Sequence, residues 1–286
     1  MDTVAVITDS VAALPAAVAN AHGIYQIPVR LTVDGRTYSD TEEDLPDPLV
    51  EKFRSTTRID TTPWPPEYYS QMYQRIGRNQ PDMVHVVAFS QFTSTISLAR
   101  EGALMARVAS PAIRVEVVDS ATTGMAQGLV ALAAARAAQQ GASLENCCEV
   151  ARSVAGRVVS VFALDSLDYV ARTGRVNRLA AWASSLLRTT PVVRLALGKE
   201  HPLFLARSKQ QAAKHIVTVV EEAANCGGPV HTAVMESDPG ESETLARMLR
   251  ERVPLAECIM APFTPVMRIV GGPGVVGIAF YTDTAT

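Results

Sequence analysis

The sequence predicts an α/β protein in two parts: an N-terminal domain with a doubly wound, mainly parallel sheet, and a C-terminal α+β domain. In the first half, short apolar runs alternate with longer segments of helical character, which is typical of consecutive βαβ units. Beyond about residue 157 the apolar runs follow one another more closely, with fewer helices between them. We therefore expect an α/β domain at residues 1–157 and an α+β domain at residues 158–286.

The elements of the first domain follow from apolar runs that end at turn residues. Strands are expected at residues 4–7, 24–33, 83–88 and 115–118, with a hairpin signal at Asp34-Gly35. Helices are expected to open near Leu14-Pro15 and Asp47-Pro48, because proline fits the first turn of a helix. Further helices are expected at residues 67–78, from about 95 to 108, at 125–140 and at 143–157.

In the second domain, the expected strands are not separated by a helix each time. Strands are expected at residues 158–164, 192–197, 202–206, 230–235, 258–261 and 277–281. Helices are expected to begin near Gln210 and Ser242. Helices thus lie between only some of these strands, which indicates an α+β layout.

Composition and charge exclude several classes of protein. Of the 286 residues, 48% are hydrophobic and 19% are charged, as expected for a packed globular protein. The 26 Lys and Arg against 29 Asp and Glu give a net charge of -3, so nothing in the charge favours nucleic acid binding. The N-terminus lacks the features of a signal peptide, and the apolar run at 131–138 is interrupted by Arg136. We expect a cytoplasmic protein.

The spacing of potential ligands argues against a metal or cofactor. The four cysteines lack paired metal-ligand spacing, and the five histidines form no His-x-x-x-His pair. Residues 272–277 match G-x-G-x-x-G, but this motif precedes a strand instead of a helix. Gly272 and Gly274 are therefore expected to form a close-packed turn against a ligand or partner, not a dinucleotide site.

Polar side chains follow three of the predicted parallel strands. They are Asp9-Ser10, Thr93-Ser94-Thr95 and Asp119-Ser120. Ligands of open α/β sheets bind outside the carboxyl ends of the strands, where hydroxyls and helix N-termini suit an anion. Helix capping is the alternative role, and we favour it for Asp9 and Asp119.

A basic turn at Gly174-Arg175 is a further candidate site. Arg175 directly follows a glycine, so the turn can direct its guanidinium toward a carboxylate or phosphate. A solvated turn with a glycine that ends a helix is the alternative interpretation.

Several segments, in the right order, resemble the DegV family of bacterial lipid-binding proteins. Residues 167–176 and 186–193 resemble "LeYLkkGGRI…LLxIKPIL", residues 7–15 "ITDSTaDLP", Thr61-Thr62 with Pro66-Glu67 "TSQPSPeeF", residues 90–95 "SSxLSGT", and residues 272–277 "HxGPGalG". The matches run from Ile7 to Phe280, so the resemblance covers nearly the whole chain.

The resemblance implies a protein that binds fatty acids and is not itself an enzyme. It places the fatty acid carboxylate at Thr61 and Thr93, with Thr62 and Ser94 beside them. It implies an acyl tunnel in the first domain, completed at the headgroup by the second. It also implies a partner kinase that converts the carboxylate into an acyl phosphate for phospholipid metabolism, with only transient membrane contact.

The sequence departs from the family pattern near the headgroup. Val270 stands where the pattern has histidine, and Arg268 stands where it has glycine. Arg175, Arg268, Gly272 and Gly274 are the candidates for the neighbourhood of the headgroup, although Arg268 could equally be a surface residue. Without the histidine, binding is expected to depend little on pH between about 6 and 8.

Two other functions stay open from the sequence. One is an enzyme that acts on a small anion at the strand ends, with Asp9 as the base. The other is a lipid-sensing interaction protein without a kinase. No nucleophile–base pair or phosphate-binding loop is recognisable, which weakens the first alternative without excluding it.

Overall fold

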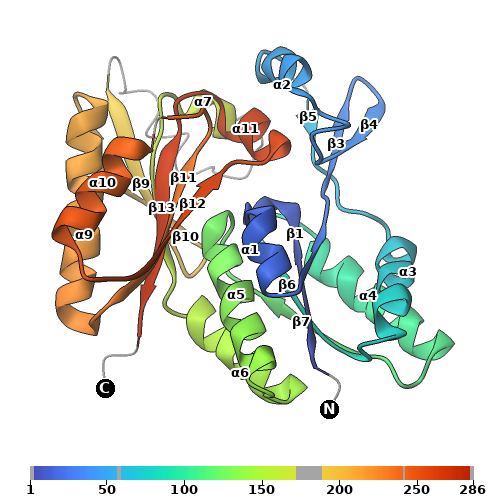
Figure 1. Cartoon of the computed structure of the whole chain (residues 1–286). Coiled ribbons are helices and arrows are strands. Elements are labelled where there is room, and N and C mark those ends of the chain that lie inside the picture. The colour runs from blue at the N-terminus through green and yellow to red at the C-terminus, as the bar shows by residue number, and fades with distance from the viewer. Residues whose placement is uncertain (1–2, 57–58, 172–188, 241, 284–286) are drawn as a thin grey trace.

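A computed structural model describes residues 3–56, 59–171, 189–240 and 242–283 of the chain. A four-stranded sheet lies in the first half and a six-stranded sheet in the second, and a small three-stranded sheet projects beside them (Figure 1). The predicted combination of an α/β half and an α+β half is confirmed.

The first sheet is entirely parallel, with the strand order β2-β1-β6-β7. Its strands are β1 (Ala5–Asp9), β2 (Ile24–Ile27), β6 (Asp82–Val87) and β7 (Arg114–Asp119), and the short helices η1 (Ser10–Ala12) and α1 (Ala16–Ala21) connect β1 to β2. Helices α3 (Pro66–Gly77) and α4 (Thr95–Ala109) cover one face, and α5 (Met125–Gln139) and α6 (Leu144–Ala155) the other. The prediction of a doubly wound parallel sheet is therefore confirmed.

The second sheet has the order β10-β9-β8-β13-β11-β12, and β11 and β12 form its parallel pair. Its strands are β8 (Val159–Ala163), β9 (Thr190–Ala196), β10 (Lys199–Ala206), β11 (Val230–Glu236), β12 (Leu255–Pro262) and β13 (Val276–Thr282). Helices α9 (Lys209–Gly227) and α10 (Glu243–Arg252) cover its outer face.

Helix α5 lies between the two sheets and packs against both (Figure 1). Nearly all of its residues are buried, including Leu129 and Ala134. One continuous core joins these side chains to Val84 of the first sheet and Ala279 of the second. A helix that is apolar on all sides is a buried helix, which is why this sequence occupies the centre of the molecule.

Strands β3 (Arg30–Val33), β4 (Arg36–Ser39) and β5 (Ile59–Asp60), with helix α2 (Asp47–Arg54), form what we call the small lobe. The hairpin at Asp34-Gly35 is confirmed. The expectation of one strand at residues 24–33 is wrong, because the chain leaves the first sheet at Pro28, which has no N–H to donate. The next amide, Val29 N–H, donates to Ser10 Oγ at 3.0 Å.

Helix α11 (Pro265–Gly271) has no counterpart in the sequence prediction. Thr264 caps it by accepting a hydrogen bond from Met267 N–H, and Pro265 occupies its first turn. One face of α11 packs Val266 and Ile269 against Leu31 and Phe53 of the small lobe. The short helix α7 (Asp168–Ala171) also contacts α11.

Candidate ligand-binding site

A cavity lies where both large sheets and the small lobe meet. Asp9 and Ala88 line it from the carboxyl ends of β1 and β6. The chain passes from β1 to β2 on one side, while β6 lies on the other, so the strand order reverses beside β1. Ligands of open α/β sheets bind at such a point. The cavity is therefore at the edge of the sheet where the sequence predicts an anion site.

The walls of the cavity are mainly apolar. The first half contributes Ile27 and Phe92, the second sheet Phe162 and Leu195, and helix α11 Val266 and Met267. The cavity encloses about 1370 Å³ when the space open to solvent is included. An apolar chamber with a few polar groups is the usual form of a small-molecule site.

Two of the predicted carboxylate-binding residues, Thr61 and Thr93, line this cavity. Thr61 follows β5, and Thr93 precedes α4. The hydroxyl of Thr93 lies 2.8 Å from that of Thr95, and it accepts a hydrogen bond from the Thr95 backbone N–H at 3.3 Å. The fold thus brings together two residues that are far apart in the sequence.

The two predicted neighbours, Thr62 and Ser94, are not part of the cavity lining. Thr62 Oγ1 donates to Asp60 Oδ1 at 2.7 Å. Ser94 is the N-cap residue of α4, but its side chain makes no capping hydrogen bond. A role for either residue at the carboxylate stays a prediction.

Asp9 is a buried carboxyl group in the wall of the cavity. Its side chain makes no capping hydrogen bond to η1. Instead, Oδ1 accepts a hydrogen bond from Gln127 Nε2 at 3.0 Å and Oδ2 accepts one from Ala88 N–H at 3.3 Å. Burial raises the pKa of Asp9 to about 6 and outweighs these hydrogen bonds, which lower it. The cavity therefore contains a carboxyl group that titrates close to neutral pH.

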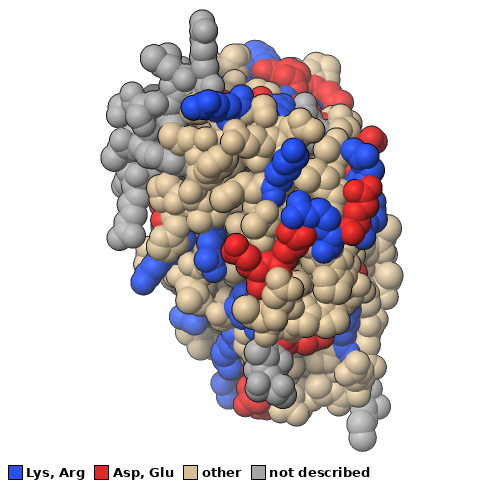
Figure 2. All heavy atoms as spheres, turned by 90° about the vertical axis from the view of Figure 1, so that its left-hand side faces the viewer, with Lys and Arg blue, Asp and Glu red and all other residues tan. Residues whose placement is uncertain are grey.

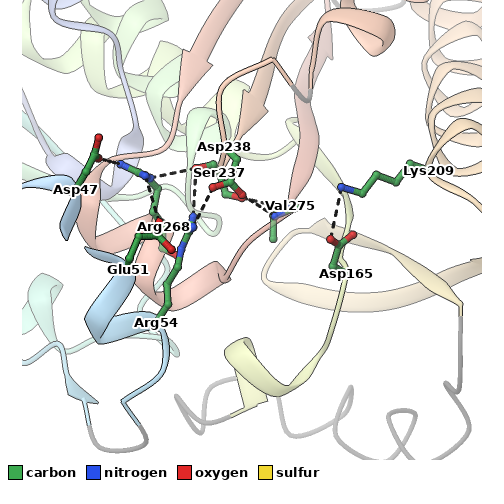
Figure 3. Close-up of polar contacts among 10 residues, drawn as sticks. Asp47, Glu51, Arg54, Asp165, Lys209, Ser237, Asp238, Arg268 and Val275 are labelled. Atoms are coloured by element: carbon green, nitrogen blue, oxygen red, sulfur yellow. Dashed lines mark hydrogen bonds and ion pairs between the residues drawn. The ribbon is translucent and has the colours of Figure 1, made fainter. Parts of the chain in front are cut away.

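Val270 and Arg268 lie on α11 but face different surroundings. Val270 lines the cavity, whereas Arg268 is not part of the lining. Arg268 Nη1 pairs with Asp47 Oδ1 at 2.6 Å, and its Nε donates to Ser237 O at 3.1 Å (Figure 3). Arg268 thus connects α11 to the small lobe and to the end of β11.

Arg54 reinforces this connection. Its Nη1 pairs with Asp238 Oδ1 at 2.9 Å and its Nε donates to the carbonyl oxygen of Arg268 at 3.3 Å. Burial alone would raise the pKa of Asp238, but hydrogen bonds from Gly274 N–H and Arg54 outweigh it and lower that pKa. The small lobe is therefore joined to the second sheet by a charged network around the buried Arg54 (Figure 3).

Gly272 and Gly274 form a close-packed turn, and a ligand or partner against it stays a prediction. Both have positive φ angles, 82° and 69°. A Cβ at Gly272 would overlap the ring of Tyr169, and one at Gly274 would overlap the carboxylate of Asp165, which also pairs with Lys209 at 3.5 Å. Neither glycine lines the cavity. Arg175 lies outside the described residues.

Thr95, one of the polar residues that the sequence places at the strand ends, also lines the cavity. So do Tyr69 and Glu200, to which the sequence analysis gives no role. Tyr69 precedes the core residues Tyr73 and Ile76 of α3 by four and seven positions. This helical spacing is that of an ordinary buried helix face, so it gives no sign of a binding role. Glu200 lies in β10, and only the folding of the second sheet against the first brings it to the cavity.

Other classes of site find no support in the described part of the chain. Among those residues, no group of three or more His, Cys, Asp or Glu side chains is arranged to hold a metal ion. None of the helices described is long and apolar enough to cross a membrane. On the face formed by α9 and α10, basic and acidic side chains are interspersed (Figure 2).

The fold and the cavity define a class of protein: a two-sheet α/β protein with a mainly apolar ligand chamber that has hydroxyl groups in its wall. The sequence model for uncharacterised proteins of the DegV family matches residues 3–283. A DegV domain-containing protein of Streptomyces coelicolor is 30% identical over 277 residues, which are 96% of this chain and 97% of that protein. The chain belongs to the DegV family.

Solved structures agree with this assignment. A fatty acid-binding DegV family protein from Thermus thermophilus has a TM-score of 0.89 at 22% identity and covers 98% of this chain and 99% of its own. DegV from Bacillus subtilis, described as a fatty acid-binding protein, has a TM-score of 0.84 at 25% identity and covers 99% of this chain and 100% of its own.

Proposed function

We propose that this protein binds a long-chain fatty acid, with the acyl chain in the apolar cavity and the carboxylate at the hydroxyls of Thr61 and Thr93. The observation that carries the proposal is that both residues line the same, mainly apolar cavity. The fatty acid-binding relatives from Thermus thermophilus and Bacillus subtilis support it. Thr62 and Ser94 are further candidates for binding the carboxylate, and Arg175 is a candidate for the neighbourhood of the headgroup.

Apolar burial supplies most of the affinity in this proposal. An acyl chain with about 14 methylene groups gains roughly 11 kcal/mol on burial at about 0.8 kcal/mol each, before association costs reduce the gain. Hydrogen bonds from the hydroxyls contribute less and mainly orient the carboxylate. The size of the cavity then selects the length of the acyl chain. Its few polar residues select the chemistry of the headgroup.

The bound carboxylate is presented to a partner kinase, which converts it into an acyl phosphate for phospholipid metabolism. The protein itself acts as the non-catalytic subunit. Membership of the DegV family supports this role, since it is the role that the family resemblance implies. Gly272 and Gly274 shape the turn beside α11, and Arg175 assists phosphoryl transfer more than lipid binding.

The properties of Asp9 favour the alternative function, an enzyme that acts on a small anion. Its pKa of about 6 suits a general base, and it lines the cavity. The apolar walls favour a lipid instead. The two functions are separated by turnover: an enzyme loses turnover of a small acid in Asp9→Asn, whereas a binding protein has no turnover to lose.

Lipid extraction from the purified protein tests the proposal directly. We expect mass spectrometry of a denatured preparation to recover a long-chain fatty acid. Thr93→Val should weaken fatty acid binding by roughly 1–3 kcal/mol, because a charged group is left short of one hydrogen bond. Ser97→Ala is the matched control, since Ser97 is an exposed hydroxyl residue of α4 close to Thr93 in the sequence that does not line the cavity. Repeated recovery of a sugar phosphate, a nucleotide or no lipid contradicts the proposal.

A further inference from the structure

Tyr69 of α3 places a phenol in the wall of the cavity. Its side chain is held firmly, because Gly102 of α4 lies so close that a Cβ there would be 2.7 Å from Tyr69 Cβ. The ring also contacts those of Tyr68 and Tyr73, with centroid distances of 6.2 and 6.5 Å. A side chain fixed in this way loses little conformational freedom when it binds a ligand.

The phenol of Tyr69 remains protonated over the whole physiological pH range. Burial raises its pKa well above the ordinary value, and the nearby carboxylate of Asp9 acts in the same direction. Hydrogen bonding with Thr95 and with the backbone of Trp64 acts in the opposite direction but is outweighed. Tyr69 is therefore a neutral hydrogen-bond donor.

The phenol of Tyr69 lies in the cavity wall beside Asp9 and Thr95, where the carboxylate of a bound ligand could accept its hydrogen bond. The oxygens of Asp9 already accept hydrogen bonds from Gln127 and from the Ala88 amide. Thr95 lies between Tyr69 and Thr93, since its hydroxyl is 2.8 Å from that of Thr93. The phenol and the Thr93 hydroxyl are thus close neighbours in the wall of one cavity.

We propose that Tyr69 donates a hydrogen bond to the carboxylate of the bound fatty acid, beside Thr93. This inference rests on the proposed function and adds a specificity-determining residue to it. Val270, which stands where the family pattern has histidine, can neither donate a hydrogen bond nor carry charge, and Tyr69 supplies a donor from another wall of the same cavity. Because the acceptor is ionised, the bond discriminates a carboxylate from a neutral headgroup.

Titrations of Tyr69→Phe with palmitate and with 1-hexadecanol test this proposal. We expect palmitate binding to weaken about 10-fold or more, because the lost bond has a charged acceptor. Binding of 1-hexadecanol should weaken clearly less, by about fivefold, since its bond is to a neutral group. Tyr68→Phe is the matched control, because Tyr68 is on the same helix but does not line the cavity. Its ring stacks on that of Trp64, with the two centroids 4.4 Å apart.

A second substitution separates binding from structure. Val270→His introduced into Tyr69→Phe should recover part of the palmitate affinity, because an imidazole replaces the missing donor. Equal weakening for both ligands, or unchanged palmitate binding in Tyr69→Phe, overturns the role of Tyr69. If the wild-type protein binds no palmitate at all, the proposed function itself fails, and this inference fails with it.

Discussion

Asp9 places a titratable carboxyl group in the core of the binding site. Its pKa of about 6 in the folded protein exceeds the value of 3.8 for an exposed aspartate. The folded protein therefore holds this proton more tightly than the unfolded chain does. The resulting stabilisation is complete below about pH 3.8 and is lost as the pH rises through about 6.

We expect this linkage to appear in the unfolding free energy. The difference between about 6 and 3.8 corresponds to roughly 3 kcal/mol. The free energy of unfolding of the wild type, relative to that of Asp9→Asn, should fall by about this amount between about pH 4 and pH 7. Urea titrations at several pH values measure it. A difference that stays constant over this range contradicts the burial of an ionisable Asp9.

Asp9 also revises the expectation that binding is nearly independent of pH. That expectation considers only the histidine that Val270 replaces. A carboxylate ligand close to Asp9 is bound more readily when Asp9 is protonated, so affinity should decline as the pH rises through about 6. The sequence places Asp9 at a strand end, but it cannot distinguish a helix cap from a cavity wall, because both positions suit the same residue.

The connection between the small lobe and the second sheet depends on α2 and α11. Arg54 is 6% exposed and its partner Asp238 is 30% exposed, so removing the guanidinium leaves a half-buried carboxylate without its partner. Apolar contacts of Phe53 with Val266 and Ile269 support the same connection. The charged network and this apolar cluster together hold α11 in place as a wall of the cavity.

We expect Arg54→Ala to lower the free energy of unfolding by roughly 3 kcal/mol, the lower end of the range for breaking a buried ion pair. It should also speed the dissociation of fatty acid, because Val266 and Met267 of α11 line the cavity. Arg252→Ala is the control, since its pair with Glu221 joins α10 to α9 at a more exposed site. Denaturant titrations and stopped-flow displacement measure both effects. Equal losses for the two variants contradict the role of Arg54.

The sequence predicts the elements of this region only in part. The strands of the first sheet and helix α2 follow from apolar runs, turn residues and prolines. Helix α11 was missed because it has only seven residues, too few to show helical periodicity, although Thr264-Pro265 is a recognisable start. The partner of Arg54 could not be predicted, because Asp238 lies 184 residues away in the sequence.

At the scale of the whole molecule, α5 makes the two halves interdependent. The sequence predicts two domains that divide at residues 157 and 158, and the two large sheets lie on either side of this point. The division into folding units stays a prediction. A helix that is apolar on every side can be recognised as buried, but its sequence does not show that two different sheets bury it. The single core around α5 indicates that the halves stabilise each other.

We expect the chain to unfold in one cooperative transition, because neither half can keep α5 buried after the other unfolds. A Trp182→Phe background leaves Trp64, which lines the cavity, as the single indole. Its fluorescence should then follow the same denaturant curve as far-UV circular dichroism, which reports helices of both halves. Palmitate should shift both curves together, by about 2.7 kcal/mol at 100 times its Kd, since the cavity is lined by both halves. Separate transitions, or a shift of the fluorescence curve alone, would show that the halves unfold independently and that the ligand stabilises only one of them.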